Sequence, residues 1–203
     1  RLSHLGRLRQ QGRLPQIPIY LDSPMAVNAS SIFCDHLGEH RLTEKQCRDA
    51  CGIAEYVREA EDSKQLNRSA MPKIIISASG MATGGRILHH LKHYAPSHRN
   101  TIILAGFQAG GTRGAALRDG ATELKIHGSY IPVRAEVAQL DMLSAHADQD
   151  ELLRWLEGFR SSPQQVFVTH GEPGASDTLR HLVTERLGWN ARVPEHAEEV
   201  VLS

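Results

Sequence analysis

Residues 73–94 read KIIISASGMATGGRILHHLKHY, and this stretch decides the fold class. Residues 73–77 form an apolar run of the kind that is typical of a strand buried on both faces. The run leads directly into a glycine-rich turn, and residues 87–94 after the turn are predicted to form a helix. A buried strand joined to a helix in this way is the repeating unit of α/β proteins with a mainly parallel sheet.

Strands and helices alternate in the same way on both sides of this stretch. Before it, we predict a helix in residues 1–12, a strand in 17–21 and mostly polar helices over 26–66. After it, the predicted elements are a strand at 101–105, a helix ending at 119, a hairpin of 123–126 with 132–140, a helix at 150–159, a strand at 165–169, a helix at 175–187 and a closing strand at 199–202. The alternation predicts an α/β fold whose mainly parallel sheet is flanked by helices.

The composition is that of an ordinary globular protein, with 40% hydrophobic and 23% charged residues among 203. The 23 basic residues equal the 23 acidic ones, so net charge gives no evidence for nucleic-acid binding, and any such binding requires a local basic patch.

We find no membrane span and no signal peptide, and we therefore predict a cytoplasmic protein without a membrane partner. Because the chain begins at Arg1 and not at Met, we expect it to be a piece of something longer.

The three cysteines, Cys34, Cys47 and Cys51, contain no CxxC pair, and their odd number favours free, buried thiols. The sequence has 12 histidines, which are potential metal ligands, so its composition is compatible with a metal site. Two of them, His89 and His93, share one face of the predicted helix, which we expect to be an exposed polar face.

A first candidate anion site is the glycine-rich turn of residues 79–86. Glycines allow backbone amides to approach an oxyanion closely, and the following helix start adds partial positive charge. An arginine there can supply a bidentate contact to a phosphate. The candidate residues are Ser79, Gly80, Thr83, Gly84, Gly85 and Arg86. Spacing alone favours the alternative of a tight strand-to-helix turn, and the absence of Gly-Lys-Ser/Thr excludes a Walker loop.

A second glycine-rich turn, with Gly110, Gly111 and Arg113, follows the strand at 101–105. Two such loops at neighbouring strand ends indicate an anion-binding rim. Asp22 also follows a strand; with Ser23 and Pro24 behind it, it is typical of a helix start, whereas a metal carboxylate there would need a histidine nearby in space.

Two histidines stand at predicted strand ends, each with a carboxylate two residues further on. His146 precedes Asp148, and His170 precedes Glu172. The helix and strand between them place both imidazoles on the same rim of a layered sheet, where sites usually form. This arrangement predicts a metal or phosphate site in which Asp148 orients His146. The alternative is a pair of hydrogen-bonded histidines without such a role.

Taken together, these motifs resemble the β-CASP branch of the metallo-β-lactamase fold, the RNA-processing nucleases related to the cleavage and polyadenylation endonuclease and to bacterial ribonuclease J. The resemblance covers nearly the whole chain and rests on SAHAD at 144–148, HGE at 170–172, SGMATGGR at 79–86, DSPMA at 22–26 and NRS at 67–69. It implies a β-CASP domain in residues 1–140 and, in 141–203, the C-terminal portion of an αββα metallo-β-lactamase sandwich.

The resemblance also implies roles for single residues. His146 would contact the scissile phosphate and act as general acid, and His170 would bind one of two zinc ions. Ser144, Arg113 and the first glycine-rich loop would face single-stranded RNA. Two such metals would activate a bridging water and neutralise charge on the phosphodiester.

The chain departs from the family because it has neither the upstream His-x-His-x-Asp-His segment nor the acidic motif that precedes the inserted domain. We therefore expect the C-terminal half of a zinc-dependent RNA nuclease, which alone holds no two-zinc centre and has no nuclease activity. Its partners would be RNA and the missing N-terminal half, and exposed sheet edges would favour a homodimer. The alternatives are a catalytically silent RNA-binding or scaffold member of the family, and an α/β enzyme that binds a small phosphate compound.

Overall fold

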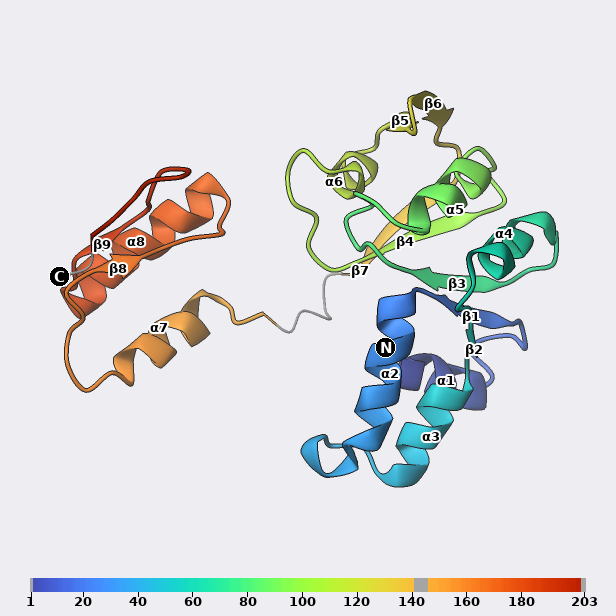
Figure 1. Ribbon diagram of the computed structural model, residues 1–203, viewed down its shortest axis with the longest axis horizontal. Helices are drawn as coiled ribbons and strands as arrows, with labels where there is room; N and C mark the ends of the chain where they lie inside the picture. Colours follow the sequence, from blue (N-terminus) through green and yellow to red (C-terminus); the bar gives the residue numbers. More distant parts are fainter. Residues whose placement is uncertain (1, 141–145, 202–203) are drawn as a thin grey trace. The chain divides into compact units, whose positions relative to one another are not determined.

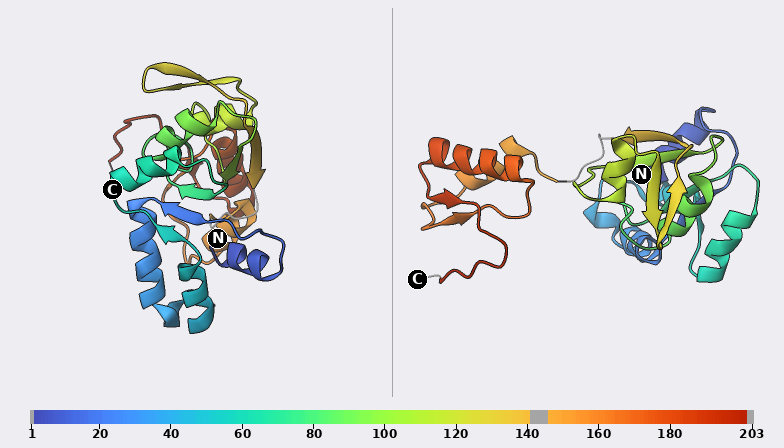
Figure 2. Two further views of the ribbon diagram at one scale, coloured as in Figure 1. Left: turned by 90° about the vertical axis from the view of Figure 1, so that its right-hand side faces the viewer. Right: turned by 90° about the horizontal axis from the view of Figure 1, so that it is seen from above.

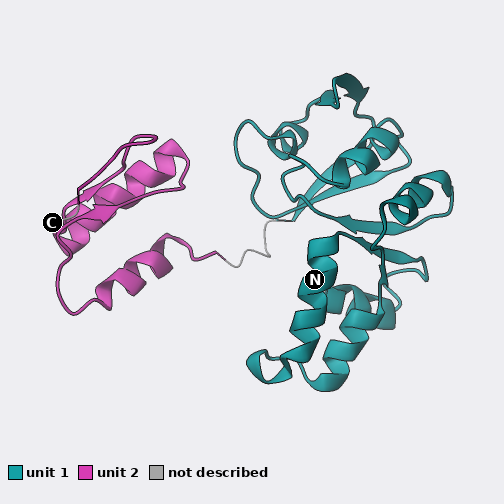
Figure 3. Cartoon of the chain, viewed as in Figure 1, with its two compact units in different colours: residues 1–142 teal, residues 143–203 magenta. Residues whose placement is uncertain are grey.

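The structure, a computed structural model, describes residues 2–140 and 146–201 (Figure 1). It forms two compact units, unit 1 with residues 1–142 and unit 2 with residues 143–203 (Figure 3). The assignment of 1–140 and 141–203 to two functional domains stays a prediction. Within the described ranges, no helix has both the length and the hydropathy that a membrane span requires.

Unit 1 alternates helices and strands along most of its length. Its elements are α1 (Leu2–Gln10), β1 (Ile19–Asp22), α2 (Pro24–Asp35), the short 3-10 helix η1 (Leu37–Glu39), α3 (Glu44–Gly52), β2 (Glu55–Tyr56), α4 (Ala60–Arg68), β3 (Ile74–Ser77), α5 (Ile87–Tyr94), β4 (Thr101–Ala105), α6 (Arg113–Arg118), β5 (Glu123–Ile126), β6 (Ser129–Pro132) and β7 (Glu136–Leu140).

The strands of unit 1 pair mainly in parallel. In a three-stranded sheet of order β2-β1-β3, the central β1 pairs in parallel with both neighbours. Strands β4 and β7 form a second parallel pair, and β5 with β6 is antiparallel. The α/β fold class with helices flanking parallel strands is therefore confirmed (Figure 1).

Two apolar clusters hold unit 1 together. In one, the side chains of β1 pack against those of α2, with Ile19 and Val27 each 1% exposed. In the other, α5, β4, α6 and the β5-β6 hairpin meet around Leu117 and Ile126. Helices α2 and α3 lie side by side (Figures 1 and 2), and α1 also packs against α3. Helix α2 thereby packs against β1, at whose carboxyl end the predicted site residue Asp22 lies.

Unit 2 consists of α7 (Gln149–Glu157), β8 (Val166–Phe167), α8 (Pro173–Leu187) and β9 (Ala191–Arg192). Strands β8 and β9 pair in parallel. Both helices and both strands share a core around Leu153, Val183 and Trp189, so Trp189 is a packing residue.

Two predicted strand arrangements are wrong. The hairpin predicted after residues 123–126 forms, but its second strand is β6 at 129–132, so that of the predicted partner 132–140 only residue 132 pairs with β5, and β7 instead joins β4. The reason is the turn at His127 and Gly128, whose φ angles of 47° and 79° suit a two-residue hairpin loop that brings the partner strand back at once. The predicted closing strand also fails, because residues 199–201 form no strand and 202 lies outside the described residues.

The prediction of three free thiols is correct only for Cys47, which is buried. Cys34 and Cys51 form a disulfide between α2 and α3. Their proximity arises because these two helices pack side by side, which the spacing of cysteines along the chain does not show.

Candidate functional site

A buried carboxylate organises the carboxyl end of β1. The side chain of Asp22 is 0% exposed. Arg86 Nη1 donates to its Oδ1 at 2.6 Å. Ser63 Oγ and His90 Nε2 both lie 2.6 Å from its Oδ2. Three donors from α4, the first glycine-rich loop and α5 thus converge on one carboxylate, so that Asp22 is a structural anchor of this region.

The neighbouring Ser23 caps α2, because its hydroxyl accepts a hydrogen bond from Ala26 N at 3.3 Å. This confirms the predicted helix start. The histidine that Asp22 would need nearby is present in His90, but the remaining contacts of the carboxylate are to Arg86 and Ser63. Both oxygens of the Asp22 carboxylate already accept hydrogen bonds from protein side chains, and this is not the arrangement of a metal ligand.

The guanidinium of Arg86 forms hydrogen bonds with other groups of the chain. Besides Asp22, its guanidinium donates to the carbonyl of Val57 at 3.0 Å and to that of Arg58 at 2.6 Å. The side chain is 18% exposed. These contacts tie the start of α5 to β1 and to the segment after β2, which indicates that Arg86 fixes the first glycine-rich loop in place.

His90 is buried at 4% exposure, with its Nδ1 2.8 Å from Asn67 Oδ1. Burial lowers the pKa of His90 below its ordinary value, although Asp22 acts in the opposite direction. Burial raises the pKa of Asp22, but hydrogen bonds from Ser63, His90 and Arg86 outweigh it, so that this pKa is also lowered. Both pKa values in this cluster are therefore held below their ordinary values, that of Asp22 by its hydrogen-bond donors and that of His90 by burial.

The lowered pKa of His90 predicts that unit 1 loses stability in mild acid. The unfolded chain takes up a proton at His90 near pH 6.5, whereas the folded chain does so only at lower pH. The stabilisation is therefore complete above pH 6.5 and declines as the pH falls toward the folded pKa. Asp22 adds a further loss only below its ordinary value of 3.8.

Urea unfolding between pH 7.5 and pH 5, followed by circular dichroism, measures this loss. We expect His90→Gln to flatten the dependence on pH, while the matched change of exposed His98→Gln leaves it as in the parent. An identical slope in the parent and in His90→Gln would show that His90 does not cause it.

The two glycine-rich loops are directly joined. Gly114 N donates to Met81 O at 2.9 Å, and Arg113 Nη1 lies 3.3 Å from Ala82 O and 3.4 Å from Thr83 O. A Cβ atom on Gly114 would overlap the side chain of Gln108 and lie 3.1 Å from Met81 Cα. The loops meet closely at this point only because residue 114 is glycine.

Beside this junction lies a surface pocket of about 340 Å³. Its lining combines both loops with β5, and the residues are Thr83, Gly111, Thr112, Arg113, Ala116, Glu123, Leu124 and Lys125. Hydroxyl and cationic donors dominate the polar groups, with Glu123 as the acidic exception. Ser79 lies beneath Thr83, with 3.0 Å between their hydroxyl oxygens. Gly80 and Gly85 are exposed in the same loop, and Gly84 is half-buried.

Two large apolar side chains at strand ends were missed by the sequence analysis. Phe107 follows β4 and is 63% exposed, and Met25 follows β1 and is 72% exposed. For Phe107 the available signal is an aromatic residue within a turn of small and polar residues, where no core position is expected, whereas Met25 lies in the first turn of α2. An exposed phenylalanine beside a glycine-rich loop offers a flat face on which a nucleobase can stack.

In unit 2 the two predicted histidines lie at the starts of helices. His146 is exposed and comes shortly before α7. Asp148 caps that helix: its carboxylate accepts a hydrogen bond from Glu151 N at 2.9 Å, and the Glu151 carboxylate accepts one from Asp148 N at 3.0 Å. Ser144 lies outside the described residues. The role of Asp148 in orienting His146 stays a prediction.

His170 lies between β8 and α8, with a φ of 64°. The next residue, Gly171, lies so close to Ser176 that a Cβ atom on it would overlap the serine hydroxyl. Glu172 occupies the N-cap position of α8. This tight turn keeps His170 exposed at the helix start.

The described residues do not provide a two-zinc centre at these histidines. Among residues 2–140 and 146–201, one group of three ligating side chains lies close enough to hold an ion, and it consists of Cys34, Cys47 and Cys51. Structural and catalytic zinc sites use at least three protein ligands. His170 would therefore need ligands from elsewhere to hold zinc.

Comparison with known families gives two matches that together span most of the chain. Residues 2–117 match the Beta-Casp domain, and residues 130–194 match the Zn-dependent metallo-hydrolase RNA specificity domain.

Several similar proteins have names that refer to a ribonuclease or to transcription termination. The Ribonuclease TTHA0252 of Thermus thermophilus is 42% identical over 79% of this chain and 38% of its own length. The Transcription termination factor FttA of Pyrococcus abyssi is 30% identical over 91% of this chain and 30% of its own length. An RNase J-like protein of Methanocaldococcus jannaschii is 30% identical over 80% and 38%, respectively. The chain thus spans between 30% and 38% of the length of these relatives.

Proposed function

Because this chain belongs to the β-CASP family of metallo-β-lactamase-fold nucleases, we propose that it is the RNA-binding, C-terminal part of a zinc-dependent ribonuclease. The reaction would be hydrolysis of RNA phosphodiester bonds during cytoplasmic RNA processing or decay. The proposed partners are single-stranded RNA, an upstream metallo-β-lactamase half and a second copy of the chain. The similarity to a protein named ribonuclease supports the reaction.

The observation that carries the proposal is the junction of the two glycine-rich loops in unit 1. Arg113 and Gly114 connect α6 to the loop before α5, and the pocket beside them presents the Thr83 and Thr112 hydroxyls together with Lys125. Donors of this kind contact the phosphates of a nucleic acid without reading its sequence. Phe107, exposed in the same loop as Gly111, would stack on a base.

His146 and His170 would supply the chemistry of the longer protein. A protonated imidazole at His146 would donate a proton to the leaving oxygen of the cleaved RNA. His170 would be one ligand of zinc, completed by ligands that the described residues do not supply. This chain by itself would therefore bind RNA without cleaving it.

In a second candidate function, the longer protein, like this chain alone, binds RNA but does not cleave it. Relatives named transcription termination factor support this second candidate, because that name does not specify cleavage. Cleavage by the longer protein separates the two functions, because a silent scaffold would bind RNA and leave it intact.

We expect Phe107→Ala to weaken the binding of single-stranded RNA by this chain. Loss of one stacked base removes about 1–3 kcal/mol, or roughly 5- to 150-fold in affinity. Fluorescence anisotropy with a labelled uridine-rich oligonucleotide at fixed salt measures the effect. The matched control is Phe33→Ala, because Phe33 is also an exposed phenylalanine of unit 1 but stacks on His40 in a different region. Equal affinities of both variants and the parent would remove Phe107 from the RNA surface.

A further inference from the structure

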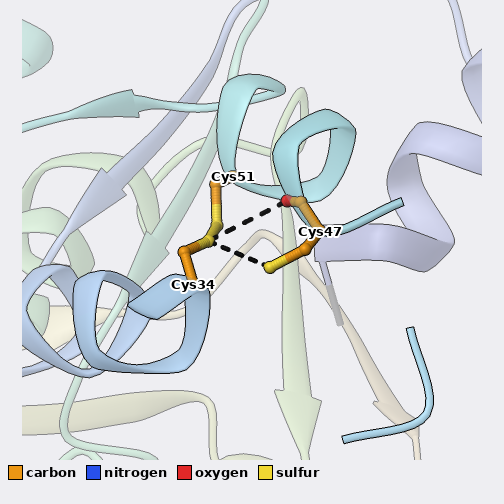
Figure 4. A group of neighbouring side chains, drawn as sticks. All are labelled: Cys34, Cys47 and Cys51. Carbon is orange, nitrogen blue, oxygen red and sulfur yellow. Dashed lines mark hydrogen bonds between the residues drawn. A yellow bond between two sulfur atoms is a disulfide. The ribbon is translucent and has the colours of Figure 1, made fainter. Parts of the chain in front are cut away.

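The three cysteines of the chain gather at one place between α2 and α3. Cys34 lies in the last turn of α2, and Cys47 and Cys51 lie one turn apart on α3, so that they share the face turned toward α2 (Figure 4). Their three Sγ atoms lie within 4.8 Å of one another. Cys47 Sγ is 3.1 Å from Cys34 Sγ, although Cys47 is not part of the disulfide.

We propose that these three cysteines, when reduced, form a thiolate site for one zinc-class divalent cation. A tetrahedral zinc ion with Zn–S bonds of about 2.3 Å holds its sulfurs roughly 3.8 Å apart. In the oxidised chain Cys47 Sγ is 3.1 Å from Cys34 Sγ, and all three sulfurs lie within 4.8 Å of one another, an upper limit that exceeds this spacing. Thiolates are soft ligands that favour zinc over magnesium or calcium, and three of them leave the fourth position for water or another ligand.

Burial supports a real site and not a chance encounter of side chains. Cys47 is 0% exposed and fixes the inner end of the cluster, whereas Cys34 and Cys51 are half-buried and give an ion a route from solvent. The site joins α2 to α3, and α2 starts directly behind the Asp22 anchor. An ion would therefore brace the helices that support the carboxyl end of β1.

The Cys34–Cys51 disulfide and the ion exclude each other, since two of the three ligands are consumed by the disulfide. A dithiol reductant would transfer two electrons and two protons to the disulfide and become oxidised to its own disulfide. The three thiols would then bind the cation and release their protons to solvent. An oxidised dithiol, which accepts two electrons and two protons and becomes a dithiol again, reforms the Cys34–Cys51 disulfide and thereby expels the ion.

The test is a Co²⁺ titration of the 203-residue chain, reduced with a dithiol and then freed of reductant under nitrogen. We expect a thiolate-to-cobalt charge-transfer band that saturates at one ion per chain and is lost when Zn²⁺ is added. Cys34→Ser, a half-buried position, should abolish the band, and the oxidised chain should not show it. A double change of His146→Ala and His170→Ala should leave the band unchanged.

The proposal is overturned if the reduced chain, with three titratable thiols, gives no such band, or if the band survives in Cys34→Ser. It is also overturned if the band depends on the two histidines. Should the reduced chain lose helix in the absence of metal, circular dichroism decides: recovery of the helical signal on addition of Zn²⁺ supports the site, and no recovery contradicts it.

Discussion

Replacing His146 with alanine in the longer ribonuclease that we propose is expected to lower the rate of RNA cleavage by about 10²- to 10⁴-fold, the usual contribution of a general acid. His146 is exposed just before α7, in the motif that resembles the family's phosphate-contacting segment. Without the imidazole, the leaving oxygen departs without a positioned proton donor. Single-turnover cleavage of a labelled RNA at saturating enzyme isolates this step from binding.

Two controls make this result specific. The zinc content and the RNA affinity of His146→Ala should equal those of the parent, because the proposed zinc ligand is His170. The matched variant His181→Ala removes an exposed histidine of α8 from the same unit and should cleave at the parental rate. A parental rate in His146→Ala would show that the proton comes from another group.

Replacing Asp22 with asparagine is expected to destabilise unit 1 by about 3–5 kcal/mol, the range observed when one partner of a buried charged pair is removed. The amide retains the shape of the carboxylate but not its charge, so that the half-buried Arg86 loses its buried counter-ion. The donors of Ser63 and His90 also meet an NH₂ group where an oxygen accepted both.

The two units allow this change to be followed with an internal control. Both tryptophans, Trp155 and Trp189, lie in unit 2, so tryptophan fluorescence reports that unit and should give an unchanged urea midpoint. Circular dichroism includes unit 1 and should show an earlier transition. Asp119→Asn, a change at an exposed ion pair with Arg118, should leave both transitions close to those of the parent. Equal midpoints for Asp22→Asn and Asp119→Asn would contradict the anchoring role of Asp22.

The elements that surround the site follow from local sequence patterns. The apolar run at 73–77, the glycine-rich turn and the helix at 87–94 correspond closely to β3, the loop and α5, because each is set by residues near one another in the chain. The sequence does not identify the second strand of the hairpin, because apolar and polar residues alternate in both 129–132 and 136–140 and either segment is compatible with pairing. The positive φ angles at His127 and Gly128 select the nearer partner.

What the sequence could not supply is which polar groups meet. Asp22 lies more than sixty residues before Arg86 and His90 in the chain. The hydrogen bonds between them depend on the parallel register of β1 with β3. That Arg86 binds a phosphate stays a prediction; its contacts within the chain, to Asp22 and two carbonyls, could not be read from the sequence. The contact between the two glycine-rich loops was predicted as a shared rim, and the structure joins them through Gly114.

The cysteines show the same limit. Their spacing gave no pairing, because the cluster arises only when α2 and α3 pack side by side (Figure 4). Phe107 was overlooked for a different reason: a single exposed aromatic residue has no periodic pattern that marks it.

The central claim is that this chain binds RNA but needs further zinc ligands to cleave it. The most direct test incubates the 203-residue chain with a 5′-labelled single-stranded RNA and Zn²⁺, and follows both the mobility of the complex and the length of the RNA. Our account predicts a complex that weakens as salt is raised, with RNA of unchanged length. Cleavage by the pure chain that EDTA abolishes, or the absence of a complex at low salt, would contradict it.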